Sequence, residues 1–395
     1  MSYTNLEQTI RESGVLRCLE CGKCTAICPI ARFDGGFSPR VTVGRALARG
    51  GHDEALLRDD RLWTCLNCLQ CNQVCPAAVD YSSLTTAVRI EARRIGQAAL
   101  CTHGETIHVW MRMMMRPDLT QNRLGWLEPN FKFQISNFKS LIPNLQSQTL
   151  YFAGCAPHYD ALFAPLGVKG TQVAQDSVRI LNALGIEPLV LADERCCGHD
   201  LLWEGDLDGF RKLAELNAEM IRASGVKRVV SSCPECVRAL KVDYAAHGIP
   251  LNIEVVHLSE LLANTQYPIP KAKGKTVTFH DPCRLGRHLG VYDAPRKVLE
   301  GLGYKVVEMR HARRNATCCG TNGWTHCDAA NKAIQVQRLR EAKATGADVM
   351  VTACLKCQIH FRCALMDEQL KDEIGIEMVD LATLAAAQLR LETIG

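Results

Sequence analysis

The sequence predicts an α-helical N-terminal domain followed by two copies of a cysteine-rich α/β domain. Three observations lead to this prediction. Cysteine is unusually abundant, with 21 copies in 395 residues, and two tandem runs of four cysteines occur before Asp80. The segments around these runs have helical patterning. The rest of the chain repeats one order of short apolar strands, helices and cysteines, which indicates two related units.

The composition is that of a globular protein with more than one domain. A length of 395 residues exceeds one ordinary domain, and the chain is 47% hydrophobic and 22% charged. The formal charge is only +4 and the basic residues are scattered, so no nucleic-acid partner is expected.

The sequence shows neither an export signal nor a membrane span. It begins with polar residues and has no apolar run of the ~18 residues that a transmembrane helix needs. Val109–Arg116 is the most apolar candidate, but arginine interrupts it. It predicts a packed helix, and the alternative is a segment that docks on a partner or on a membrane surface. We expect a cytoplasmic protein that becomes membrane-associated only through a partner. In such a reducing compartment, this density of cysteine indicates metal binding rather than disulfides.

Two cysteine runs of identical spacing define the N-terminal domain. Each reads C-x2-C-x2-C-x3-C-P, the spacing of bacterial ferredoxins with two [4Fe–4S] clusters. The first run contains Cys18, Cys21, Cys24 and Cys28, and the second contains Cys65, Cys68, Cys71 and Cys75. The two-residue gaps let three thiolates converge on one face of a cubane cluster, and the proline ends the loop.

The fourth cysteine of each such run ligates the other cluster. One cubane is therefore predicted on Cys18, Cys21, Cys24 and Cys75, and the other on Cys65, Cys68, Cys71 and Cys28. Zinc is the alternative for four thiolates, but zinc sites usually use two well-separated pairs of ligands. Two complete runs in tandem favour iron–sulfur clusters.

The domain around these cysteines is predicted to be helical. Val43–Arg49 has a helical pattern that ends at Gly50–Gly51, where a helix C-cap belongs. Asp53–Leu57 is a second short pattern, and residues 82–100 form a third. We therefore expect an α-helical two-cluster ferredoxin domain rather than the small β-sheet type.

An internal repeat organises the remainder of the chain. The first copy has predicted helices at 171–184 and 207–223 and predicted strands at Thr149–Ala153, Pro188–Leu191 and Arg228–Ser231. The second copy has predicted helices at 293–302 and 329–344 and predicted strands at Thr276–Phe279, Tyr304–Val307 and Asp348–Thr352. Short apolar strands that alternate with helices indicate parallel α/β packing.

Each copy places five cysteines directly after its strands. The first set is Cys155, Cys196, Cys197, Cys233 and Cys236, and the second is Cys283, Cys318, Cys319, Cys354 and Cys357. Open α/β sheets place their ligands at this carboxyl edge. Each C-x-x-C pair also falls at a predicted helix N-terminus, where the backbone dipoles favour thiolate over thiol.

Adjacent cysteines suit a multi-iron cluster better than a compact tetrahedral site. Buried free cysteine is the alternative, but it would have to recur at five matching positions in both copies. The glycine after each pair predicts a positive φ or a close backbone approach. Cys101, Cys327 and Cys363 lie outside the motifs and are predicted to be structural thiols. Of the three, Cys327 is close enough in sequence to Cys318–Cys319 to contribute to the second site.

Together these motifs resemble the D-type subunits of the heterodisulfide reductase family over nearly the whole chain. That family fuses a ferredoxin module to two cysteine-rich "CCG" domains. The boundaries would fall at 1–100 for the ferredoxin domain, 101–147 for a helical and loop-rich connector, and 148–265 and 274–395 for the CCG domains. The architecture is also similar to the iron–sulfur subunits of glycolate oxidase, anaerobic glycerol-3-phosphate dehydrogenase and lactate-utilisation enzymes, some of which lack part of the CCG cysteine set.

The resemblance implies a noncubane [4Fe–4S] cluster in each CCG domain, and in the reductases two such clusters split a disulfide by one electron each. Catalytic relatives have a histidine directly after the first cysteine of the second motif, where this chain has Arg284. His280 and His288 flank that position and are candidate acids, because histidine titrates near neutrality. The alternative is that these two histidines and His158 are ordinary polar residues.

We expect an oxidoreductase subunit that passes electrons between the cubanes and the CCG clusters of a larger complex and that reduces a disulfide or another two-electron acceptor. No glycine-rich nucleotide fingerprint joins a strand to a helix, so flavin or NAD is expected in a partner flavoprotein or other redox subunit, and a membrane cytochrome is reached only through such partners. One alternative is an iron–sulfur relay subunit of a flavin-dependent glycolate, lactate or glycerol-3-phosphate dehydrogenase. Another is a non-redox zinc scaffold.

Overall fold

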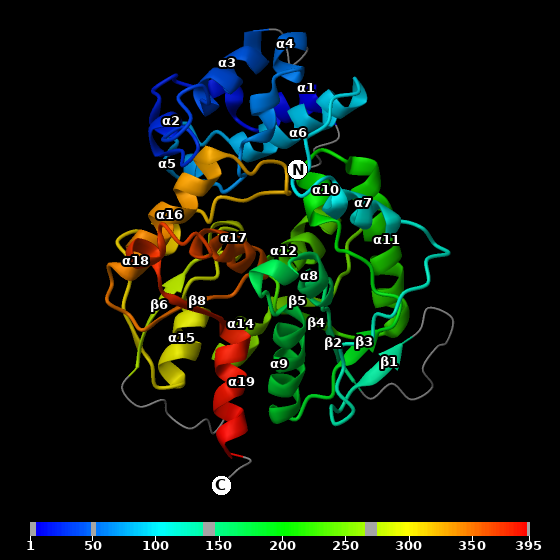
Figure 1. The fold of residues 1–395 in the computed structure, drawn as a ribbon. Helices are drawn as coiled ribbons and strands as arrows, with labels where there is room; N and C mark the ends of the chain where they lie inside the picture. Colours follow the sequence, from blue (N-terminus) through cyan, green and yellow to red (C-terminus); the bar gives the residue numbers. More distant parts are fainter. Residues whose placement is uncertain (1–4, 49–52, 137–146, 265–274, 393–395) are drawn as a thin grey trace.

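A helical module lies at one end of the molecule, above two α/β units that stand side by side (Figure 1). The computed structural model describes residues 5–48, 53–136, 147–264 and 275–392. Within these ranges, no helix is both long and apolar enough to cross a membrane.

The N-terminal module is built from short helices and loops over its described residues. These helices are α1 (Leu6–Glu12), α2 (Lys23–Ile27), α3 (Pro39–Ala48), α4 (Glu54–Leu57), α5 (Gln70–Val74) and α6 (Tyr81–Arg94). The side chain of Asp53 caps α4 by accepting a hydrogen bond from the amide of Ala55 at 3.1 Å. The predicted helix at 82–100 is shorter than expected, since α6 ends at Arg94, just before Gly96 with φ of 81°. The predicted cap at Gly50–Gly51 lies outside the described residues.

The first α/β unit contains a five-stranded parallel sheet in the order β1-β3-β2-β4-β5. Its strands are β1 (Gln134–Ser136), β2 (Thr149–Tyr151), β3 (Leu189–Leu191), β4 (Arg228–Ser231) and β5 (Glu254–His257). Its helices are α7 (Thr106–Met113), α8 (Ala156–Leu162), α9 (Gly170–Ala183), α10 (His199–Trp203), α11 (Leu207–Ser224), α12 (Pro234–Arg238), α13 (Tyr244–Ala246) and α14 (Leu258–Ala263). Strand β1 lies in the segment expected to be a helical and loop-rich connector, which is therefore partly built into this sheet.

The second unit repeats the arrangement with a four-stranded parallel sheet in the order β7-β6-β8-β9. Its strands are β6 (Thr276–His280), β7 (Lys305–Val306), β8 (Val349–Thr352) and β9 (Glu377–Asp380). Its helices are α15 (Asp293–Gly301), α16 (Ala329–Lys343), α17 (Leu355–Leu365), α18 (Lys371–Ile374) and α19 (Leu381–Glu392). The alternation of short strands and helices is the one that the sequence predicted for both copies.

The two α/β units exchange their last helices. Helix α14 of the first unit packs on α15 of the second, and α19 of the second packs on α9 of the first. Val178 and Leu181 from α9 accordingly share one buried cluster with Ala382 and Ala385 from α19. This shared core fixes the carboxyl edge of one sheet against that of the other.

The N-terminal module is attached to both units through buried contacts. Leu66 and Val88 belong to the same apolar cluster as Cys318 and Ile334 of the second unit. Arg89 on α6 is fully buried and donates to the carbonyl of Trp203 in the first unit at 2.7 Å. The second ferredoxin run therefore lies next to the region where the three modules meet.

Candidate metal centre

Two pockets in the N-terminal module are lined by cysteine thiols. One is lined by Cys18, Cys21, Cys24, Cys71 and Cys75. The other is lined by Cys28, Cys65, Cys68 and Cys71. The structure thus brings together the two sets of four that the sequence assigned to cubane clusters, with the last cysteine of each run crossing to the other set.

Matching backbone turns produce these two pockets. Helix α2 begins after Gly22 with φ of 75°, and α5 begins after Leu69 with φ of 61°. Both residues directly follow the second cysteine of their run. For leucine this left-handed conformation costs about 1–2 kcal/mol. Strain of this kind persists where the surroundings impose it, commonly at functional sites.

The pocket that contains Cys28, Cys65, Cys68 and Cys71 is called the inner ferredoxin pocket, and the one that contains Cys18, Cys21, Cys24 and Cys75 the outer ferredoxin pocket. The thiols of the inner pocket are suited to binding a positively charged group. Burial raises the pKa of Cys28, Cys65 and Cys71, and the neighbouring thiolates raise those of Cys28 and Cys71 further. Several buried thiolates in one pocket therefore need a positive charge, which the irons of a cluster supply. The four-sulfur donor set is also the one that cubane clusters use.

In the first α/β unit all five predicted cysteines meet. Sγ of Cys155 lies 3.5 Å from Sγ of Cys196. Thiol–thiol hydrogen bonds then continue from Cys196 to Cys197, from Cys197 to Cys236 and from Cys236 to Cys233. Hydrogen bonds from Cys155 and Cys197 hold the pKa of the Cys196 thiol well below its ordinary value, which favours a thiolate ligand at this position.

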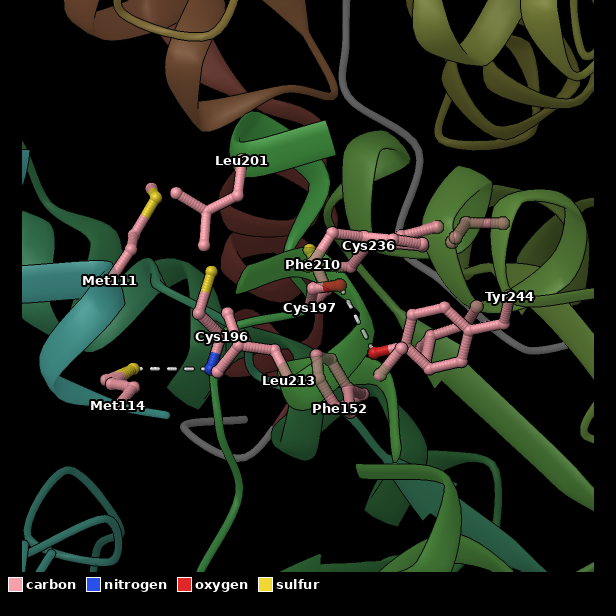
Figure 2. Close-up of a cluster of buried hydrophobic side chains, with 14 of the residues drawn as sticks. Met111, Met114, Phe152, Cys196, Cys197, Leu201, Phe210, Leu213, Cys236 and Tyr244 are labelled. Atoms are coloured by element: carbon pink, nitrogen blue, oxygen red, sulfur yellow. Dashed lines mark hydrogen bonds between the residues drawn. The ribbon is translucent and has the colours of Figure 1, made fainter. Parts of the chain in front are cut away.

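Figure 2 shows that Cys196, Cys197 and Cys236 of this first site lie among buried apolar side chains and that two hydrogen bonds hold the Cys196–Cys197 backbone. The amide of Cys196 donates to Sδ of Met114 at 3.2 Å, and the hydroxyl of Tyr244 donates to the carbonyl of Cys197 at 3.2 Å. Gly198 has φ of 80° and Gly320, its counterpart in the second unit, has φ of 94°. The expected positive φ after each cysteine pair is therefore confirmed.

The second α/β unit gathers its cysteines in the same manner. Thiol–thiol hydrogen bonds connect Cys283 to Cys318, Cys318 to Cys319, Cys319 to Cys357 and Cys357 to Cys354. Cys354 is the N-cap of α17, as Cys233 is of α12, which confirms the predicted helix N-termini. Hydrogen bonds from Cys318 and Cys357 hold the pKa of Cys319 well below its ordinary value.

The inner ferredoxin pocket and the second α/β site are in direct contact. The thiol of Cys68 forms a hydrogen bond with the thiol of Cys318. This bond lowers the pKa of Cys68 to about 6, with help from the nearby Arg287 guanidinium. One predicted cubane site therefore adjoins one predicted CCG site.

A buried ion cluster separates the two α/β sites. Lys356, inside the second C-x-x-C pair, lies 2.7 Å from the carboxylate of Glu235, inside the first pair. Its ammonium also contacts the carboxylate of Asp200 on α10. The ring of Trp324 lies 5.2 Å from the same ammonium. The side chains of Lys356 and Asp200 are only 3% and 4% exposed. Their charges are therefore stabilised by pairing with each other and not by water.

Arg284 joins this cluster to the ferredoxin module. Its guanidinium donates to Nε2 of His199 at 3.0 Å, to the carbonyl of Asn67 at 2.6 Å and to Oδ1 of Asn322 at 2.7 Å. It also lies 3.9 Å from Sγ of Cys283. The residue that replaces histidine in the family pattern therefore connects all three modules.

The three candidate catalytic residues lie in different surroundings. Nδ1 of His280 accepts from Arg338 at 3.1 Å, so its ring proton is on Nε2, and one nitrogen of this ring lies within 4.8 Å of the thiols of Cys319 and Cys357. Nε2 of His288 contacts the carbonyl of Asn67 and Arg284, each at 2.8 Å. Burial and the nearby arginines lower the pKa of both histidines, so both are neutral near pH 7.

Sequence reasoning did not find Asp200, Glu235 and Lys356. The signal that was available is the opposite charge of Glu235 and Lys356 inside two matching C-x-x-C pairs. Cys327 and Cys363 are exposed and electrostatically coupled, while Cys101 is buried. The described thiol contacts of the second site do not include Cys327.

Comparison with known proteins supports this division of the chain. A 4Fe-4S dicluster domain matches residues 14–79, and a cysteine-rich domain matches twice, over residues 149–241 and 277–362. A hypothetical protein from Helicobacter pylori shares the fold, with a TM-score of 0.55 and 10% identity over 89% of this chain and 68% of that chain.

Two curated relatives are oxidoreductases or their subunits. The chain is 36% identical to the D-type subunit of the dihydromethanophenazine:CoB–CoM heterodisulfide reductase of Methanosarcina mazei, over 69% of this chain and 64% of that protein. It is 32% identical to the EtfAB:quinone oxidoreductase of Syntrophomonas wolfei, over 60% of this chain and 34% of that protein. The chain thus spans less than two thirds of the length of these relatives.

Proposed function

The chain belongs to the family of D-type heterodisulfide reductase subunits, and on that premise we propose that it is the iron–sulfur electron-transfer subunit of a multi-subunit oxidoreductase. Electrons would pass between the two ferredoxin clusters and the clusters of the CCG units. The contact between Cys68 and Cys318 carries this proposal, because it makes a cubane site and a CCG site neighbours.

The proposed clusters follow the thiol groups described above. Each set of four ferredoxin cysteines would hold one cubane, and each set of five CCG cysteines would hold one noncubane cluster. Bound clusters supply one-electron transfer. The chain's own contribution near the ferredoxin module is positive charge beside the thiols: Arg284 and Arg287 lie beside Cys68 and Cys283, and the fields of both guanidiniums lower the pKa of these two thiols.

We propose that the substrate that receives the electrons is a disulfide or another two-electron acceptor, and that it binds at the CCG sites. His280 is the candidate that best suits proton handling, because its ring lies within 4.8 Å of the Cys319 and Cys357 thiols and its Nε2 has no hydrogen-bond partner of acceptable geometry among the described residues. Arg284 would instead act by its fixed charge beside Cys283. For His288, the contacts with Asn67 and Arg284 support a positioning role.

A partner is proposed to dock at the outer ferredoxin pocket. Cys21 is exposed there, and Leu19, which lines the same pocket, is 69% exposed. Leu16, in the short turn Val15–Arg17 before the first cysteine, is 64% exposed. Apolar side chains next to an accessible cluster suit a redox partner, because burying them would bring the two redox centres together. A flavoprotein or another redox subunit would supply the flavin or NAD chemistry, and a membrane cytochrome would be reached through it.

The test is to purify the chain anaerobically and to measure iron, acid-labile sulfide and electron paramagnetic resonance during stepwise oxidation with thiols. About sixteen irons per chain are expected for four clusters, with a paramagnetic signal that depends on the thiol. A Cys319→Ser variant should lose that signal, and a Cys363→Ser variant should keep it. About eight irons without such a signal would restrict the proposal to the ferredoxin module.

A second candidate is a relay subunit that performs no bond chemistry, such as the iron–sulfur subunit of a flavin-dependent dehydrogenase. The similarity to an EtfAB:quinone oxidoreductase favours it, as does the salt-bridged cluster between the two CCG sites. A full complement of iron without a thiol-dependent signal would select this candidate.

A further inference from the structure

Three side chains that no cysteine motif includes meet where the modules join. One possible ligand atom from each of Cys101, Glu105 and His108 lies within 4.8 Å of the others. Cys101 follows the ferredoxin helix α6, and His108 lies on α7. The segment between them is short, and it is held to the second α/β unit by the amide of Thr102, which donates to the carbonyl of Trp324 at 2.8 Å.

The backbone of this segment is bent so that Glu105 faces Cys101. His103, Gly104 and Glu105 have φ of 61°, 61° and 64°, three consecutive left-handed residues of which two are not glycine. Oε1 of Glu105 accepts from the amide of Cys101 at 2.6 Å. Such strain is kept only where surrounding contacts impose it, and here it folds a carboxylate back toward a thiol.

The imidazole of His108 is oriented like that of a metal ligand. The ring is 0% exposed, and Nε2 lies 2.5 Å from the carbonyl oxygen of Gly323. When Nε2 donates to that carbonyl, Nδ1 presents a lone pair. Histidines that bind metals usually donate their second ring N–H to a carbonyl or carboxylate in this way, which fixes the tautomer.

Nδ1 of His108 faces a buried carboxylate. Nδ1 lies 3.0 Å from Oε2 of Glu204, whose side chain is 1% exposed, and a terminal nitrogen of Arg93 lies 3.6 Å from the same oxygen. Neither Nδ1 nor Oε2 has a hydrogen bond of acceptable geometry among the described residues. The other oxygen, Oε1, accepts from Arg112 at 2.7 Å. A buried imidazole nitrogen and a buried carboxylate oxygen this close need a cation between them, either a proton or a metal ion, because Arg93 is too far from Oε2 for a hydrogen bond.

We propose that Cys101, Glu105 and His108 form a further metal site for a zinc-class divalent ion, with Glu204 beside it. Thiolate, imidazole and carboxylate together are the ligand types of zinc. Glu105 is exposed, which gives the ion a route to a site whose other two ligands are buried. The ion would connect the end of α6, the carboxylate of the first α/β unit and the Gly323 loop of the second unit.

The experiment uses the full chain with its clusters, purified anaerobically from medium that contains zinc. Zinc and iron are quantified together, and zinc X-ray absorption reports the ligands. We expect about one zinc per chain, bound to one sulfur and to nitrogen or oxygen ligands. The Cys101→Ser and His108→Gln variants should lose this zinc but keep their iron. Cys327→Ser and Cys363→Ser, which remove exposed thiols, should keep both.

The outcomes separate this proposal from the one for the clusters. Zinc that persists in Cys101→Ser with a sulfur-only ligand set belongs to a cysteine motif and overturns the proposed site. Absence of zinc from the wild type also overturns it, and a proton between His108 and Glu204 is then the cation. Loss of zinc at constant iron supports the site whatever the iron content is.

Discussion

The thiol of Cys68 is hydrogen-bonded to the thiol of Cys318, so the second ferredoxin run touches the Cys-Cys-Gly motif of the second α/β unit. One side chain holds the two loops together. Arg287 donates from Nε to the carbonyl of Cys68 and from a terminal nitrogen to the carbonyl of Ala316 at 2.6 Å. It thereby fixes the spacing across which we propose that electrons pass.

Replacing Arg287 with methionine should slow electron transfer between the ferredoxin clusters and the second CCG cluster. The substitution keeps an apolar stem of similar length but removes the bonds to both loops, and electron tunnelling falls steeply as two centres move apart. Rapid-freeze electron paramagnetic resonance after mixing with a low-potential reductant measures this step. The cluster content of the variant should equal that of the wild type.

Arg314→Met is the matched control for Arg287→Met. Arg314 is exposed on the same loop, and Arg287 uses its carbonyl, which the substitution leaves in place. The change in net charge is identical, so an effect of net charge alone would appear in both variants. Equal rates for Arg287→Met and the wild type would contradict the proposed path.

Replacing Lys356 with methionine should destabilise the protein strongly. The change leaves Asp200 and Glu235 buried without their cation, which typically costs about 3–5 kcal/mol. The anaerobic thermal midpoint, followed by cluster absorbance, measures this loss. A triple variant that also carries Asp200→Asn and Glu235→Gln should recover part of it, because no unpaired charge then remains.

Lys371→Met serves as the control for Lys356→Met. Lys371 and its partner Glu368 are 69% and 84% exposed and lie 3.8 Å apart. Surface ion pairs of this kind contribute about 0–1 kcal/mol. If both lysine variants melt at the same temperature, the ion cluster between the CCG sites does not stabilise the fold.

Replacing Gly205 with alanine should weaken the attachment of the ferredoxin helix α6. Gly205 has φ of 87°, and a Cβ there would lie 2.7 Å from the carbonyl carbon and oxygen of Arg89. Backbone strain and overpacking together should cost about 2–5 kcal/mol. Hydrogen exchange along α6 should increase while exchange in the distant helix α19 stays unchanged.

Gly185→Ala separates backbone strain from contact. Gly185 has φ of 74°, and a Cβ there would meet no atom within 4 Å. Its cost should therefore be only the conformational part, about 1–2 kcal/mol. A thermal midpoint for Gly205→Ala that is no lower than that for Gly185→Ala would show that the approach to Arg89 is not tight.

The sequence was sufficient to predict those features of the fold and of the site that depend on residues close together in the chain. Strands β4 and β8 coincide with predicted strands because short runs of β-branched residues between turn signals identify buried strands. Each ferredoxin pocket contains one of the predicted sets of four cysteines, with Cys71 lining both, because fixed two-residue gaps restrict which thiols can share one site.

The remainder depends on how separate units pack. Strand β1 has only three residues and becomes a strand by pairing with β3, so its residue pattern alone does not predict a strand. Helices α14 and α19 each pack on a helix of the other unit. Because the two units are similar, the sequence does not reveal whether each helix packs on its own unit or on the other one. Likewise, Glu235 and Lys356 occupy variable positions of their motifs, and their pairing appears only when the two carboxyl edges meet.

Asp380 predicts a stability that falls as the pH rises from about 4 to 7. Burial raises the pKa of Asp380 to about 7, and the charge of Asp176 adds to this effect, whereas an unfolded aspartate has a pKa of about 3.9. Between these values the folded state holds a proton that the unfolded state has lost, so each increase in pH favours unfolding, and the penalty is complete above pH 7.

Asp380→Asn should remove this contribution. The asparagine Oδ1 can still accept from the amide of Ala382, as Asp380 does at 2.8 Å, and Gln358 can turn its amide to the new side chain. The variant should therefore gain thermal stability relative to the wild type as the pH rises from 5 to 8. Asp118→Asn is the control, because Arg116 lowers the pKa of that exposed carboxyl and places its titration below this range. A constant difference between Asp380→Asn and the wild type across the range would mean that Asp380 is already ionised at pH 5.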